Sequence, residues 1–90
     1  MKGFDFINQK AITKYGSEAQ SVVAMEECAE LIKEISKAYR GKLNKDGMSE
    51  EIADVLICIE QLKMMYNIAD EDVKRYKREK MQRLLERLGE

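Results

Sequence analysis

The sequence predicts an all-α protein, a small bundle of four helices. Apolar residues recur with the period of an α-helix along most of the chain. No segment alternates apolar and polar residues as a half-buried strand does, and no Asn-Gly hairpin signal is present. The 90 residues include no proline, so no helix interior is interrupted by one.

Glycines and capping residues divide this pattern into elements. Four helices are expected, at residues 4–15, 18–40, 50–66 and 71–88. The residues expected to end one helix or to cap the next are Gly16 with Ser17 and Gln20, Gly41, Ser49, Asn67 and Asp70. A polar loop bounded by glycines is expected at residues 41–47. We expect a single domain that spans residues 1–90.

Composition excludes several classes of function. The 17 acidic and 16 basic residues nearly cancel, and this balance argues against a nucleic-acid partner. The absence of histidine excludes an imidazole base and a His-containing zinc site. Cys28 and Cys58 lie thirty positions apart and fit neither a redox motif nor a disulfide framework. No signal peptide and no membrane span is visible, so a cytoplasmic protein with free thiols is expected.

Four carboxylates occupy unusual positions on the predicted helices. Glu27 lies at the shoulder of the apolar face of the second helix, and Glu30, its i,i+3 partner, lies one step further out. Glu51 falls within the apolar face of the third helix, and Asp54 lies at its edge. Glu26 points more nearly to solvent. If the two helices pack side by side, the two acidic pairs come together.

Such a cluster needs neutralisation, because ionised groups removed from water cost several kcal/mol each. Protonation, salt bridges to Lys or Arg, and a divalent cation all satisfy this need. If the third applies, oxygen ligands favour a hard cation, Mg²⁺ or else Mn²⁺.

The fourth helix is basic. Residues 74–87 carry a net charge of +5, whereas the rest of the chain sums to −6. Lys77 and Lys80 fall within its apolar face, and Arg83 and Arg87 lie at the edge. These side chains either snorkel to solvent or reach an anion held by a carboxylate-bound metal.

The two acidic groups read EExxE at Glu26–Glu30 and ExxD at Glu51–Asp54, separated by twenty residues. This pattern, on two helices with a basic helix following, resembles the signature of the MazG-like all-α nucleoside triphosphate pyrophosphohydrolases. The resemblance covers most of the chain and implies a four-helix MazG-like bundle completed by oligomerisation, as a homodimer or homotetramer. It also implies Mg²⁺-dependent cleavage of a (d)NTP to (d)NMP and pyrophosphate, with nucleotide-pool house-cleaning as the family-level role.

The resemblance also implies roles for individual residues. The metal ligands would be Glu27, Glu30, Glu51 and Asp54, and the catalytic base would be Glu30 or Glu26. Lys80 best matches the lysine that the family places on its last helix, and Lys77 and Arg83, on the same side of the fourth helix, would bind phosphate with it. The family often places Asn four residues after the lysine that matches Lys80, where this chain has Leu84.

Two questions stay open at this point. The candidates for recognition of the nucleotide base are Phe4, Phe6, Asn8, Tyr15 and Gln20, and the sequence does not rank them. The competing class of function is a non-catalytic helical module that associates through its third helix, whose apolar stripe is broader than one partner helix covers.

Overall fold

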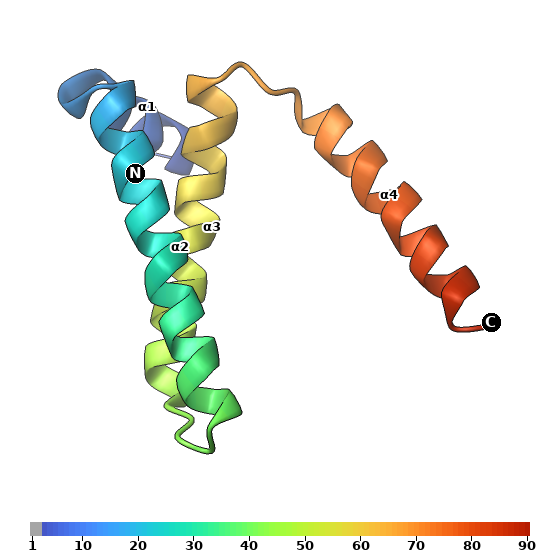
Figure 1. Ribbon diagram of the computed structural model, residues 1–90. Coiled ribbons are helices and arrows are strands. Elements are labelled where there is room, and N and C mark those ends of the chain that lie inside the picture. Colours follow the sequence, from blue (N-terminus) through green and yellow to red (C-terminus); the bar gives the residue numbers. More distant parts are fainter. Residues whose placement is uncertain (1–2) are drawn as a thin grey trace.

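The computed structural model of the protein describes residues 3–90, which form four α-helices and no strand (Figure 1). The helices are α1 (Phe4–Tyr15), α2 (Ser17–Tyr39), α3 (Lys45–Met65) and α4 (Asp70–Arg87). The predicted all-α class is confirmed, and α1, α2 and α4 begin and end within one residue of the expected positions. Within the described residues no helix is long and apolar enough to cross a membrane.

The start of α3 differs from the prediction. The helix begins at Lys45, not near residue 50, because Asn44 caps it: the Asn44 Oδ1 accepts a hydrogen bond from the Gly47 N–H at 3.0 Å. Gly47 therefore lies in the first turn of α3 and not in a loop. A Cβ at this position would lie 3.2 Å from a carboxylate oxygen of Glu34 on α2. The predicted N-cap at Ser49 is wrong, because Ser49 lies inside the helix.

Two other predicted caps are also displaced by one residue. Ser17 is the first residue of α2, and no side chain caps that helix. Gly16 makes the junction with α1 at φ 92°, a conformation that residues with a side chain rarely adopt. Asp70 is the first residue of α4, and its carboxylate binds Lys63 and Lys74, both at 2.9 Å.

Helices α1, α2 and α3 pack against one another through a small core. Ala24 and Cys58 are its buried apolar residues. A chain of three amides crosses it, in which Asn8 and Gln61 are buried and Gln20 is half-buried: Gln61 on α3 donates to Asn8 Oδ1 on α1 at 3.0 Å and accepts from Gln20 Nε2 on α2 at 2.8 Å. One glutamine side chain therefore joins all three helices.

Gln61→Ala is expected to lower the free energy of unfolding by about 2–4 kcal/mol, because Asn8 and Gln20 each lose a hydrogen-bond partner inside the bundle. Chemical denaturation at equal protein concentrations measures this change. Gln82→Ala is the matched control, since Gln82 is exposed on α4, and its effect should stay below about 0.5 kcal/mol. Equal effects of the two substitutions would contradict a structural role for the amide chain.

Helix α4 extends away from the other three helices (Figure 1), and none of its residues is buried. The shape is correspondingly open. The radius of gyration is 16.0 Å, against about 12 Å for a compact domain of this length. The accessible surface is 7402 Å², against about 5,400 Å² for a compact monomer of this mass. The oligomer expected from the sequence stays a prediction, and this open protomer is consistent with it.

Candidate metal centre

Three carboxylates from two helices meet between α2 and α3. Glu27 comes from α2, and Glu51 and Asp54 come from α3. Each offers one oxygen, and the three oxygens lie within 4.8 Å of one another. All three side chains are half-buried. This arrangement can place three oxygen ligands around one cation.

The placement follows from the periodicity of the helices. Glu51 and Asp54 are three residues apart and so lie on one side of α3. Cys58 and Gln61 continue the same side toward the end of the helix, and both are buried. The side of α3 that packs on α2 therefore carries carboxylates near its start and buried polar or small side chains near its end.

The carboxylates perturb one another. The pKa of Glu27 is raised from 4.5 to about 7 by several causes together, of which the largest is the hydrogen bond that protonated Glu27 can share with Asp54. The other causes of this rise are partial burial, the negative charge of Asp54 and the neighbouring Glu51. Glu27 is therefore about half protonated near neutral pH when no cation is bound.

The three acids have no positively charged partner among the residues that the structure describes. In residues 3–90 none of the ion pairs involves Glu27, Glu51 or Asp54. The Oε2 atom of Glu51 is buried without a hydrogen-bond partner. An acceptor oxygen in this state lacks a cation or donor, and three clustered oxygens favour a hard divalent cation.

The structure brings together three of the four expected metal ligands. Glu30 lies one turn after Glu27 on α2, is exposed, and stands outside the group of three. Glu26 is exposed as well, as its position on the predicted helix indicated. The roles predicted for these two residues stay predictions.

The basic residues expected at the phosphate lie elsewhere in the protomer. Lys77, Lys80 and Arg83 are exposed on α4, which Figure 1 shows directed away from α2 and α3. Within the described chain, the structure therefore does not bring these cations to the carboxylates of the same protomer.

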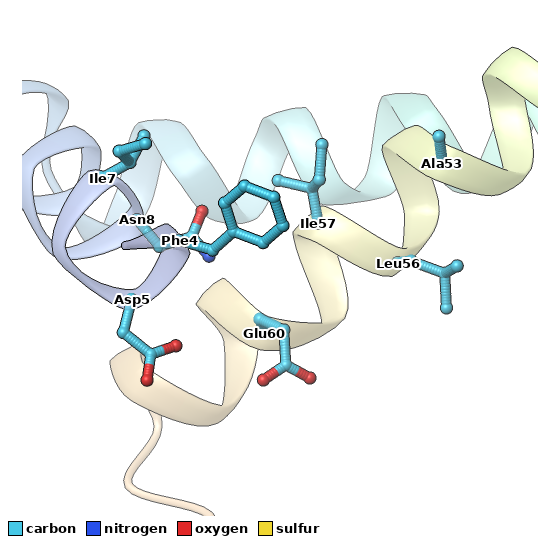
Figure 2. A pocket seen from close by; sticks show the side chains of 8 residues that line it. All are labelled: Phe4, Asp5, Ile7, Asn8, Ala53, Leu56, Ile57 and Glu60. Carbon is cyan, nitrogen blue, oxygen red and sulfur yellow. The ribbon is translucent and has the colours of Figure 1, made fainter. Parts of the chain in front are cut away.

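A groove between α1 and α3 was not predicted from the sequence. It has a volume of about 680 Å³, and Phe4 and Asn8, two of the unranked candidates for base recognition, lie along it (Figure 2). Gln61, which holds Asn8, was also missed. The position of Gln61 seven residues after Asp54 and three after Cys58 places it on the same inward side of α3, and this spacing could have identified it as buried.

The model of the MazG nucleotide pyrophosphohydrolase domain matches residues 16–88. The chain belongs to this family. The match spans α2, α3 and α4 and includes both acidic motifs, which confirms the resemblance inferred from them. No curated protein and no solved structure matches the chain.

The MazG family is metal-dependent, and the donor set found here fits a metal. It consists of carboxylate oxygens from two helices, one of them buried and unpartnered. The three residues lie within the range that the family model matches.

Proposed function

We propose that this chain is a Mg²⁺-dependent nucleoside triphosphate pyrophosphohydrolase that converts a (d)NTP to (d)NMP and pyrophosphate. The observation that carries the proposal is the group formed by Glu27, Glu51 and Asp54, which takes part in no ion pair within residues 3–90. Membership of the MazG family supplies the class of reaction. Removal of unwanted nucleotides from the cellular pool is the role we propose for it.

In the proposed site Glu27, Glu51 and Asp54 hold the cation, and Glu30 reaches it from the next turn of α2. When bound, the cation neutralises phosphate charge and acts as a Lewis acid on the reacting phosphoryl group. Glu26 or Glu30 accepts the proton of the attacking water, because both are exposed carboxylates within one turn of Glu27 on α2. Lys77, Lys80 and Arg83 bind the triphosphate and the pyrophosphate leaving group.

A second candidate is a non-catalytic interaction module. The large apolar residues left exposed on α3 and α4, among them Leu56 and Leu88, favour this alternative. The two functions differ in their response to Mg²⁺: an enzyme with the proposed site is stabilised by the ion and further by a nucleotide, whereas a scaffold responds only to ionic strength.

Pyrophosphate release from a panel of ribo- and deoxyribonucleoside triphosphates tests the proposal. We expect hydrolysis of at least one triphosphate with Mg²⁺ or Mn²⁺ and none in EDTA. The panel also identifies the preferred base and sugar. The proposal fails if no triphosphate is cleaved in the presence of either metal.

A further inference from the structure

Helices α2 and α3 lie side by side (Figure 1) and meet through facing pairs of residues that recur every seven positions. The three facing pairs are Gln20 with Gln61, Glu27 with Asp54, and Glu34 with Gly47. Each pair lies seven residues later on α2, and seven earlier on α3, than the pair before it. Seven residues make almost two helical turns, so one side of each helix faces the other at all three pairs. The acids therefore form the middle pair.

Apolar packing fixes the shift of α3 along α2 only weakly. Among residues 3–90 the buried apolar residues are Ala24 and Cys58, both small, and no large side chain is fully buried. Large side chains that interdigitate are what usually makes one register of two packed helices better than its neighbours. Where they are absent, a single buried polar contact can fix the register. The outer facing pairs are therefore the contacts that hold the acids in line.

The facing pair nearest the connection between α2 and α3 sets a carboxylate against a helix backbone. The side chain of Glu34 retains 13% of its accessible surface, and its Oε1 atom pairs with Lys37 Nζ at 2.9 Å. A Cβ on residue 47 would lie 3.2 Å from this same oxygen. The Oε2 atom is buried and has no hydrogen-bond partner in the described part of the chain. Held at one oxygen and enclosed at the other, the carboxylate has little room to move away from α3.

Gly47 occupies a position where glycine is unfavourable for the helix. It is the third residue of α3, and glycine is a poorer helix former than every residue except proline. The absence of a side chain is what allows the backbone of α3 to approach Glu34 so closely. The amino end of a helix also attracts a carboxylate, because the helix dipole places partial positive charge there. Glu34 and Gly47 thus form a specific contact between the two helices.

This contact bears directly on the acids. Glu51 and Asp54 follow Gly47 by about one and two turns on the same side of α3, so a shift of the first turn along α2 carries both acids with it. Residues that bind a metal must be held within about 0.5 Å of their working geometry. We propose that Glu34 is a positioning residue, which sits against Gly47 and thereby fixes the register that holds the acids of α3 opposite Glu27. Its effect on metal binding rests on the proposed function.

Binding of Mn²⁺ to the full chain, followed by the electron paramagnetic resonance signal of the free ion, tests the role of Glu34. Glu34→Ala removes the contact with Gly47 and should raise the dissociation constant about 10-fold or more, as loss of a supporting residue does in metal sites. Glu34→Gln keeps the size of the side chain and removes only its charge, which lies about 10 Å from Glu27 along α2. Its dissociation constant should stay within about twofold of the wild-type value, because charge at this distance is largely screened.

Gly47→Leu tests the contact from the other helix. Leucine favours a helix more than glycine does, so circular dichroism should show no loss of helix. The new side chain meets Glu34, and the dissociation constant should rise about 10-fold. Ser49→Leu is the matched control and should bind as the wild type does, since Ser49 is exposed and lies on the opposite side of α3.

The chain that carries both Glu34→Ala and Gly47→Leu shows whether the two residues act through each other. The second substitution should add no further loss of affinity, because the carboxylate that it would displace is gone. Effects that multiply, an equal loss in Ser49→Leu, or equal binding by Glu34→Ala and Glu34→Gln would each overturn the proposal.

Nuclear Overhauser contacts between the side chains of Glu27 and Asp54 in the metal-free protein give a readout that needs neither metal nor activity. These contacts should weaken in Glu34→Ala and in Gly47→Leu and stay at wild-type strength in Ser49→Leu. Unchanged contacts in the first two variants overturn the proposal. If the wild-type chain binds no metal or cleaves no triphosphate, the proposed function fails, while these contacts still decide the role of Glu34.

Discussion

Glu51→Gln and Asp54→Asn are each expected to lower Mg²⁺-dependent pyrophosphate release by about 100-fold or more. Each substitution keeps the size of the side chain and removes one of three oxygens that lie within 4.8 Å of one another. Loss of even an outer-shell partner of a metal ligand costs about 10–100-fold in affinity or activity, so loss of a ligand charge should cost at least as much. The measurement is the initial rate on the best substrate of the panel at saturating Mg²⁺.

Two further measurements separate loss of the metal from loss of the fold. Far-ultraviolet circular dichroism should show unchanged helix content, while the stabilisation of the wild-type chain by Mg²⁺ should disappear in both variants. Glu18→Gln is the matched control, since Glu18 is exposed in the first turn of α2 and stands outside the group of three. Full activity of Glu51→Gln or Asp54→Asn would show that the substituted residue is not a ligand of the catalytic metal.

The second large effect concerns pH. Glu27 has a pKa of about 7 in the folded protein against 4.5 as its ordinary value. At a pH between these two pKa values the folded state binds more protons than the unfolded state. The free energy of unfolding therefore falls as pH rises through this range. The metal-free protein is therefore expected to melt at lower temperature at pH 7.5 than at pH 5.5 on account of this group.

Glu27→Gln tests the cause of this pH dependence. The amide is neutral at every pH and can still donate a hydrogen bond to Asp54, as the protonated carboxyl does. The variant should lose most of the decline in melting temperature between pH 5.5 and 7.5 in EDTA. Glu26→Gln, one position earlier and exposed, should keep the wild-type decline. Parallel curves for wild type and Glu27→Gln would exclude Glu27 as the source.

Added Mg²⁺ should change the pH dependence in a defined direction. A cation and a proton compete for the carboxylate of Glu27, so stabilisation by the metal should be larger at pH 7.5 than at pH 5.5. At a metal concentration 100 times the dissociation constant the stabilisation is about 2.7 kcal/mol. A metal effect that is equal at both pH values would indicate binding outside the group formed by Glu27, Glu51 and Asp54.

Local sequence signals predicted the end of a helix correctly where only one residue was a strong candidate for the cap. They gave the wrong position where two residues could serve as the cap. Gly16 marks the junction of α1 and α2 because its φ of 92° suits a glycine. Before α3 both Asn44 and Ser49 can serve as a cap, and Gly47 favours a loop over a helix. The structure uses Asn44, whose side chain binds the Gly47 N–H. Nothing in the local sequence ranks these two caps.

The sequence alone determined the all-α class, the four helices and the angular position of each acid on its helix. These features depend on 3.6-residue periodicity and on spacing along one chain. The tertiary structure decided which acids meet: Glu27 joins Glu51 and Asp54, while Glu30 stays exposed outside the group. It also decided that α4 leaves the bundle, so that Lys77 and Lys80 lie apart from the acids. The reason is that helical periodicity specifies on which side of its own helix each side chain lies. How far one helix is shifted along another, and in which direction a helix leaves the preceding connection, depend instead on contacts between residues that are distant in the sequence.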